Sequence, residues 1–307
     1  MNDVLSAVAA AAACDWRGQP AIRLRLDNGD SALVALQGAQ VLSWICGGRE
    51  QLFLSPRAAH DGAASTPRPI RPIRGGIPVC FPQFNQRGPL VKHGFARILP
   101  WRADAEEAQR VSGQDVRLSL RLADTEATRA VWPHAFEAML HLQLAPGVLT
   151  VRLEVHNPGD GPLEFTAALH SYLRVPEASQ MELCGLQGLA YWDAVADTHS
   201  VQDGSVRFGA EVDRVYPRAA QPLTLRGVDG RPALAIAQTE GFSETVVWNP
   251  GPALCATLVD MESDGWRQML CVEAAAIDAP VRLAPGARWQ AAQTLHATAA
   301  AEKAAHA

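Results

Sequence analysis

One stretch of the chain, residues 71–101, gathers basic side chains on a backbone rich in glycine and proline. Its basic and imidazole groups are Arg71, Arg74, Arg87, Lys92, His93 and Arg97. Glycine and proline at this density exclude a continuous helix or a central strand, so we expect a structured loop. Guanidinium groups suit carboxylate and phosphate oxyanions. A solvated surface loop is the alternative, but the order of residues in this basic stretch favours an anion-binding site.

Two residues far apart in the sequence could form an acid–base pair. His170 lies in an apolar run, and in a strand it would share a face with Ala168 and Tyr172. Glu273 ends the apolar run 269–273, where burial would raise the pKa of its carboxyl group. Each also has a simpler interpretation. His170 could be a hydrogen-bonded core residue, and Glu273 could be a solvated residue at the rim of a sheet.

Two further residues could contact a substrate. Asp213 lies in a polar segment that leads into a strand, and a surface pair with Arg214 is the alternative. Trp248 follows three strand-forming residues, so it is either a core residue or a rim aromatic able to stack on a sugar ring. Neither residue is decisive alone.

Composition excludes several classes of protein. The 307 residues include 27 Lys and Arg against 32 Asp and Glu, a net charge of −5. A mildly acidic protein is not expected to bind nucleic acid through its whole surface. No stretch reaches the length of a membrane span, and the N-terminal segment has no Lys or Arg before its alanine run, as a secretory signal would. We therefore expect a cytoplasmic protein.

Cysteine spacing and motifs argue against metals and cofactors. The six cysteines are scattered, without a CxxC pair, and their apolar neighbours predict buried, reduced thiols. The sequence has no Rossmann glycine fingerprint, phosphate-cradling Walker loop, GxSxG elbow or HExxH motif. We therefore expect chemistry carried out by side chains alone, with no cofactor and no metal.

Short segments of alternating hydrophobicity dominate the rest of the chain and must position these residues. They are residues 22–26, 116–122, 140–144, 149–155, 163–173, 223–225, 233–237, 245–248, 269–273 and 288–296. A period of two with frequent turn residues predicts antiparallel strands, each with one buried face. Helical periodicity appears only near the termini, including an Ala-rich C-terminal tail, and around 103–110.

This pattern predicts an all-β fold, a large antiparallel β-sandwich. The strands follow one another without a linker-like stretch, a charge block or an internal repeat. We therefore expect residues 1–307 to form a single domain, with the Ala-rich N-terminal segment and the C-terminal tail at its periphery. A two-domain β protein is the alternative.

Taken together, several segments resemble the aldose 1-epimerase (mutarotase) superfamily, and most closely its branch that acts on glucose 6-phosphate. The segments that carry the resemblance are Arg74-Gly75-Gly76-Ile77-Pro78, Phe81-Pro82-Gln83-Phe84, His93-Gly94-Phe95-Ala96-Arg97, His170-Ser171-Tyr172, Asp213-Arg214-Val215-Tyr216, Val247-Trp248-Asn249-Pro250 and Cys271-Val272-Glu273. They occur in the family's order. The first three segments are highly specific, and the others support them by their order.

The resemblance implies a galactose-mutarotase-like sandwich and a hexose 6-phosphate as substrate, with a monomer as the active form. It makes His170 the general acid and Glu273 the general base. The substrate-binding candidates it implies are Arg74, His93, Arg97, Asp213, Gln83 and Trp248. Arg74 and Arg97 match the positions that would bind the phosphate.

Anomer interconversion needs one acid and one base, which we expect on opposite sides of the sugar. Reference pKa values of about 6.5 for His and about 4.3 for Glu make Glu273 the natural base, and a nearby carboxylate would raise the pKa of His170. The chain departs from the family where Ala274-Ala275 replaces Pro-Gly, and at Asn85 and Val91. Two other functions fit the same resemblance: a mutarotase for free aldoses, and a non-catalytic sugar-binding domain.

Overall fold

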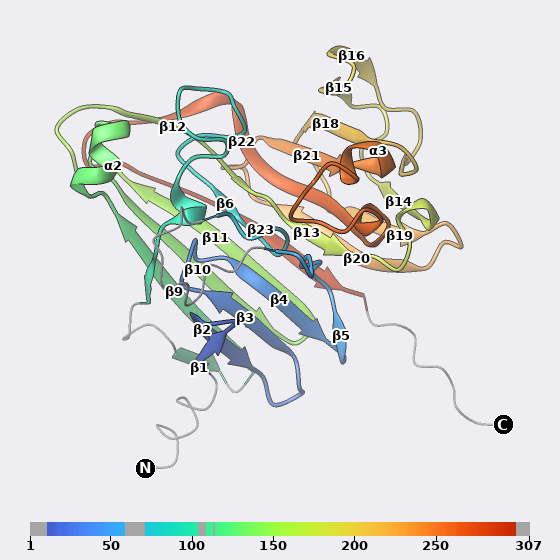
Figure 1. Ribbon diagram of the computed structural model, residues 1–307, viewed down its shortest axis with the longest axis horizontal. Coiled ribbons are helices and arrows are strands. Elements are labelled where there is room, and N and C mark those ends of the chain that lie inside the picture. The colour runs from blue at the N-terminus through green and yellow to red at the C-terminus, as the bar shows by residue number, and fades with distance from the viewer. Residues whose placement is uncertain (1–10, 59–70, 104–108, 113, 299–307) are drawn as a thin grey trace.

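The computed structural model describes residues 11–58, 71–103, 109–112 and 114–298, and these residues form mainly antiparallel β-sheet (Figure 1). The strands are β1 (Ala11–Trp16), β2 (Gln19–Arg25), β3 (Ser31–Ala35), β4 (Val41–Cys46), β5 (Arg49–Glu50), β6 (Val79–Cys80), β7 (Arg102–Ala103), β8 (Gln109–Ser112), β9 (Asp115–Ala123), β10 (Glu137–Ala145), β11 (Val148–His156), β12 (Leu163–Leu169), β13 (Tyr172–Arg174), β14 (Met181–Cys184), β15 (Ala190–Asp193), β16 (Thr198–Val201), β17 (Val206–Arg207), β18 (Val212–Pro217), β19 (Leu223–Gly227), β20 (Pro232–Gln238), β21 (Glu244–Asn249), β22 (Met269–Leu283) and β23 (Arg288–Ala297). The α-helices are α2 (Glu126–Val131) and α3 (Gly251–Cys255), and the 3₁₀ turns are η1 (Ala96–Ile98), η2 (Ala178–Gln180) and η3 (Gly265–Gln268). The predicted all-β class is confirmed. None of the helices in the described part of the chain is long and apolar enough to cross a membrane.

The described strands make three sheets. A five-stranded sheet has the order β1-β2-β3-β4-β5, and a ten-stranded sheet runs β17-β14-β19-β20-β23-β11-β10-β9-β7 with β8 on β9. An eight-stranded sheet runs β16-β15-β18-β21-β22-β12-β6, with β13 also paired to β22. Figure 1 shows the blue N-terminal sheet in front of the green strands β9–β11. Core residues from all three sheets belong to one hydrophobic cluster, so the sheets bury their apolar faces against one another.

Alternation in the sequence explains how each sheet presents its apolar face. In β10, buried and partly buried residues alternate along all nine positions. Leu140 lies opposite Leu120 of β9 and Leu153 of β11, and all three side chains are fully buried. Successive side chains of a strand point to opposite faces, so matching the apolar period across three strands produces a continuous buried row.

Three details differ from the sequence-based expectations. The strand that carries Glu273 does not end there, because the apolar residues after Glu273 continue β22 to Leu283. The run 163–173 is interrupted, since His170 and Ser171 lie between β12 and β13. The helical pattern around 103–110 does not form a helix at its described ends, which belong to β7 and β8. Residues 104–108, the first ten residues and the tail after 298 lie outside the described residues.

All six cysteines lie in the described residues and are free. Cys80, Cys255 and Cys271 are buried as expected, whereas Cys14, Cys46 and Cys184 are only partly buried. The prediction of buried thiols is therefore correct for three of the six. Those three lie on or near the eight-stranded sheet, where apolar residues flank them on both sides.

The eight-stranded sheet brings the predicted site residues together. Leu169 lies opposite Ala274, and Tyr172 lies opposite Cys271, so the intervening register places His170 opposite Glu273. On the next strands, Trp248 pairs with Cys271 and Asp213 pairs with Trp248. His170, from the connection between β12 and β13, thereby lies in one region of the sheet with residues of β22, β21 and β18.

The basic stretch crosses this region as a loop closed by tight backbone contacts. His93 and Gly94 have positive φ values of 65° and 69°, and a Cβ added at Gly94 would lie 2.2 Å from the carbonyl oxygen of Phe81. Glycine avoids both the strained conformation and the contact. The loop that presents His93 therefore depends on a glycine directly after it.

We expect Gly94→Ala to lower the free energy of unfolding by about 2 kcal/mol or more, measured by urea denaturation. Gly29 is a matched control, because its φ is also positive, 91°, but no atom lies within 4 Å of an added Cβ. Gly29→Ala should cost only the backbone strain. Equal losses in the two variants would show that the close approach at Gly94 has no energetic importance.

Candidate active site

A cleft of about 270 Å³ opens over the eight-stranded sheet. It is lined by Pro72, Ile73, Arg74, Pro78, Phe84, Asn85, Arg87, Lys92, His93, Arg97, His170, Tyr172, Trp192, Ala194, Glu211, Asp213, Val215, Val246, Trp248, Leu254, Leu258, Asp260 and Glu273. Seven of the eight predicted site residues line this cleft. Gln83 does not, so the structure gives no direct substrate contact for it.

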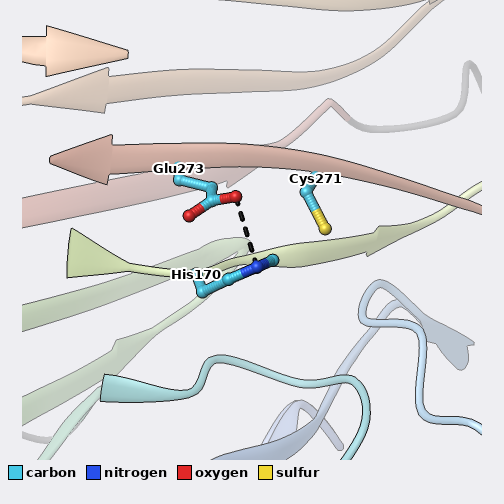
Figure 2. A group of neighbouring side chains, drawn as sticks. All are labelled: His170, Cys271 and Glu273. Atoms are coloured by element: carbon cyan, nitrogen blue, oxygen red, sulfur yellow. Dashed lines mark ion pairs between the residues drawn. The ribbon is translucent and has the colours of Figure 1, made fainter. Parts of the chain in front are cut away.

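His170 and Glu273 lie side by side among the residues that line the cleft. The Nε2 atom of His170 lies 3.4 Å from Oε1 of Glu273, and Figure 2 shows the two side chains pointing toward each other. Glu273 is only 1 % exposed, which excludes the interpretation of a solvated rim residue. The expectation that the two groups lie on opposite sides of a sugar is wrong, because paired strands place them side by side on one wall.

Side chains around the pair hold the ring of His170 in place. The ring stacks on that of Tyr172, with centroids 4.7 Å apart and an angle of 8° between the planes. The rings of His93 and Trp248 meet it edge-on at 5.4 and 6.0 Å. Trp248 is thus partly buried at the cleft and is not a core residue, so it presents an aromatic surface toward the space above the pair.

Burial and neighbouring charges favour the neutral forms of both His170 and Glu273. Burial, followed by the charges of Arg97 and Arg74, lowers the pKa of His170 well below 6.5. Burial, followed by the charge of Asp213, raises the pKa of Glu273 well above 4.5. The expectation that a carboxylate would raise the pKa of His170 is wrong, because it ignored burial and the two arginines. Both shifts favour the form of the pair in which the one shared proton is on Glu273.

Four cations of the basic stretch line the cleft and form a basic wall: Arg74, Arg87, Lys92 and Arg97. They are of two kinds. Arg74 is already paired, because its guanidinium contacts the carboxylate of Asp260 at 3.1 Å and donates to the hydroxyl of Tyr172 at 3.1 Å. Arg87 likewise pairs with Asp278 at 2.8 Å. Cations that already form ion pairs are less available to bind an anion from solution.

Arg97 and Lys92 form the unpaired part of the basic wall. Arg97 donates to the backbone oxygen of Lys92 at 2.7 Å, and its buried Nε has no hydrogen-bond partner among the described residues. Burial lowers the pKa of the Arg97 guanidinium. In the described part of the chain neither cation has a carboxylate within ion-pair distance. A partly buried cation without a carboxylate partner is costly, so this part of the cleft favours a bound anion.

Asp213 and Glu211 add acidic groups to the lining of the cleft. Burial, followed by the charges of Glu211 and Asp193, raises the pKa of Asp213 to about 6. The suggested surface pair with Arg214 is absent, since that guanidinium pairs with Asp193 at 3.3 Å instead. Asp213 therefore remains available as an acceptor for hydroxyl groups in the cleft.

Gln83 stabilises the loop from behind the cleft. Its amide donates to the backbone oxygens of Asn85 and Leu90, and its side-chain oxygen accepts from the amide of Leu90. No signal in the sequence separates this supporting role from substrate contact. Tyr172 and Asp260, which hold Arg74, were not predicted as site residues. Asp260 lies outside the segments that carry the family resemblance, so only its position in space reveals its role.

One group of side chains near the pair has metal-ligand atoms. Those of His170, Cys271 and Glu273 lie within 4.8 Å of one another (Figure 2). Two properties of the site disfavour a divalent cation. Burial raises the pKa of the Cys271 thiol well above its usual value, so the thiolate ligand is disfavoured. In addition, Arg97, Arg74 and Lys92 make the surroundings electropositive. We therefore assign no metal to this group.

Comparisons with known proteins agree with the geometry. The sequence profile of the aldose 1-epimerase family matches residues 20–296. A protein of Cenchrus ciliaris, provisionally named a glucose-6-phosphate 1-epimerase, is 33% identical over 267 residues, covering 84% of this chain and 79% of that protein. A protein of Escherichia coli with the same provisional name is 34% identical over 250 residues, covering 80% and 79%.

A solved structure extends the agreement to the fold. The structure of a provisionally named mutarotase from Salmonella typhimurium has a TM-score of 0.82 and 30% identity, and the match covers 94% of both chains. The fold, the acid–base pair in its cleft and the sequence match lead to the same conclusion. The chain belongs to the aldose 1-epimerase family.

Proposed function

We propose that this protein interconverts the α and β anomers of a hexose 6-phosphate, with glucose 6-phosphate as the expected substrate. The proposal rests on the position of an acid–base pair, His170 and Glu273, in the same cleft as Arg97 and Lys92, which lack carboxylate partners among the described residues. The pair accounts for the reaction at C1. The cations account for a substrate that carries an anion.

The reaction requires only proton transfers. A base takes the proton from the C1 hydroxyl while an acid protonates the ring oxygen, the bond between C1 and the ring oxygen breaks, and the aldehyde forms. Rotation about the C1–C2 bond and the reverse transfers give the other anomer, with both groups restored. The two reacting oxygens are bonded to the same carbon, so groups 3.4 Å apart on one wall can serve both.

Binding of the phosphate would also prepare the pair. A phosphate monoester carries a charge of about −1.5 to −2 near neutral pH, which offsets nearby cations. The charges of Arg97 and Lys92 both lower the pKa of His170, so neutralising them favours transfer of the shared proton from Glu273 to His170. Glu273 then becomes the base and His170 becomes the acid. An uncharged sugar would not produce this change.

We assign the phosphate to Arg97 and Lys92, with Arg74 in a supporting position. Arg74 is held by Asp260 and Tyr172, whereas the Nε atom of Arg97 has no hydrogen-bond partner in the part of the chain that the structure describes. Asp213 would accept hydrogen bonds from sugar hydroxyls, and Trp248 would contact the ring face. The sugar would thus lie between the basic wall and the acidic groups, with C1 above the pair.

A mutarotase for free aldoses is the second candidate function. It would use the same acid–base pair but would leave Arg97 without a counter-charge, which favours the phosphorylated substrate. A non-catalytic sugar-binding domain is favoured less, since it has no need for a buried carboxyl group 3.4 Å from an imidazole. The scattered free thiols and the family resemblance make a monomer in the cytoplasm part of the proposal.

The substrate is tested by measuring anomer exchange at C1 by NMR across pairs of free and 6-phosphorylated hexoses. We expect glucose 6-phosphate to exchange far faster than glucose at equal concentration. Equal acceleration of both would favour the free-aldose function. Binding of the hexose phosphate without any exchange would identify a non-catalytic domain.

The pKa of Asp213 predicts how substrate binding varies with pH. Below pH 6 the carboxyl group gains a proton and becomes a poorer acceptor, so we expect KM for glucose 6-phosphate to rise about tenfold as pH falls through about 6. The substrate phosphate also titrates near pH 6, so the parent must be compared with Asp213→Asn. The variant should show a higher KM and a weaker pH dependence. The same pH dependence in both proteins would exclude Asp213 as its source.

A further inference from the structure

The ring of His93 has two polar neighbours at the same nitrogen. The backbone amide of Asn85 donates to Nδ1 at 3.3 Å, and the sulfur of Cys80 lies 3.3 Å from the same atom. The backbone amide of His93 in turn donates to the carbonyl oxygen of Asn85 at 2.9 Å. These contacts join the loop residues Asn85 and His93 to strand β6, which carries Cys80.

The donor at Asn85 determines which nitrogen of His93 carries the proton. A backbone N–H can only donate, so Nδ1 must be the acceptor and must lack a proton. The neutral ring therefore carries its hydrogen on Nε2. Since Nδ1 can only accept, the thiol of Cys80 must be the donor in the second contact. His93 lines the cleft, and its Nε2 has no hydrogen-bond partner among the described residues.

A cysteine next to a histidine has another interpretation, a nucleophilic thiolate–imidazolium pair. The surroundings exclude it. Burial raises the pKa of the Cys80 thiol, and burial together with the charge of His170 lowers the pKa of His93. Both shifts keep the proton on sulfur. Cys80 also does not line the cleft, so it has no access to a substrate.

We propose that Cys80 is a positioning residue whose S–H, together with the amide of Asn85, fixes His93 as a permanent Nε2–H donor toward the reacting end of the sugar. The rings of His93 and His170 are 5.4 Å apart, so this donor lies beside the acid–base pair. A donor at this place stabilises the negative charge that develops on a sugar oxygen during ring opening. Only the identity of that oxygen rests on the proposed function.

The proposal also assigns His93 a role distinct from that of His170. His170 must change its protonation state during the reaction, whereas His93 must keep its proton. The groups whose positive charge acts on His93 are His170 when it is protonated, Arg97, Lys92 and Arg74, and all four oppose a second proton on the His93 ring. A proton on Nδ1 would in addition face the N–H of Asn85. His93 is therefore expected to stay neutral across the working pH range.

The tautomer can be read directly from the free protein. Labelling the nine histidines with ¹⁵N and comparing the parent with His93→Asn identifies the His93 resonances. We expect a proton bonded to Nε2, a bare Nδ1, and no titration between pH 5 and 9. A proton on Nδ1, or protonation of the ring in this range, would overturn the proposal. This readout does not depend on the substrate or on any activity.

Two variants then test Cys80. Cys80→Ala removes one of the two donors to Nδ1 and leaves only the long contact from the amide of Asn85, so we expect some of the Nδ1–H tautomer to appear and kcat for anomer exchange to fall about fivefold with little change in KM. Cys80→Ser keeps a donor and should restore both the tautomer and kcat. Thermal unfolding and the histidine spectrum check that each variant is folded. If Cys80→Ala changes neither the tautomer nor kcat, Cys80 has no positioning role. If exchange is absent in the parent while the tautomer is as expected, the proposed function fails and the positioning role remains.

Discussion

Replacing Glu273 by glutamine is expected to slow anomer exchange of glucose 6-phosphate by roughly 10²- to 10⁴-fold. Glutamine has the size of the protonated glutamic acid but cannot take the proton from the C1 hydroxyl. Its effect should appear in kcat, because the groups that hold the phosphate and the hydroxyls are unchanged. The exchange rate between the two C1 resonances in NMR measures this directly.

The same substitution has little reason to unfold the protein. Burial already favours the neutral form of Glu273, and glutamine resembles that form. We expect an unchanged or raised melting temperature. His170→Asn should cause a loss of similar size, and the double variant should be little slower than either single one, since the two groups act as a unit. Exchange at the parental rate in both single variants would show that the pair is not catalytic.

Replacing Arg97 by alanine is expected to raise KM for glucose 6-phosphate by on the order of 10²- to 10³-fold. The Nε atom of Arg97 is buried without a hydrogen-bond partner, and the guanidinium has no carboxylate partner among the described residues, so a bound phosphate would be its main counter-charge. Any slow exchange of free glucose should be unaffected. Steady-state measurements with both sugars give the comparison.

Arg288→Ala is a matched control for this experiment. Arg288 is 56% exposed, pairs with Glu154 and lies outside the cleft lining. Its loss should therefore leave the KM values for glucose and for glucose 6-phosphate unchanged. Lys92→Ala should have a smaller effect than Arg97→Ala, because an exposed ammonium is better solvated. If Arg97→Ala weakens the binding of glucose and of glucose 6-phosphate equally, the assignment of the phosphate to Arg97 is wrong.

The sequence predicts the fold well because alternating hydrophobicity is a local property. The strict alternation in residues 116–122 and 149–155 matches β9 and β11, and the order of motifs identifies the family. The error at Glu273 has a physical cause. Small apolar residues follow it, and neither they nor Glu273 reveals where a buried strand ends.

Charge states within the site could not be predicted in the same way. They depend on burial and on cations brought together from separate segments, such as Arg74 and Arg97 beside His170. The sequence is equally unable to show which charged side chains form ion pairs within the site. Nothing in the sequence distinguishes Arg74 from Arg97 as a phosphate-binding residue. In the structure, however, Asp260, which is distant in sequence, pairs with Arg74 and not with Arg97. The sequence likewise cannot show that Gln83 faces the loop and not the cleft.

The central claim is that the His170–Glu273 pair acts on a sugar whose phosphate is held by the basic wall. Two-dimensional exchange NMR on glucose 6-phosphate, with the purified parent protein, tests it most directly. We predict cross-peaks between the α and β C1 resonances that grow in proportion to protein concentration. Exchange that stays at the spontaneous rate with folded protein, for glucose 6-phosphate and the other hexose 6-phosphates alike, would contradict the claim.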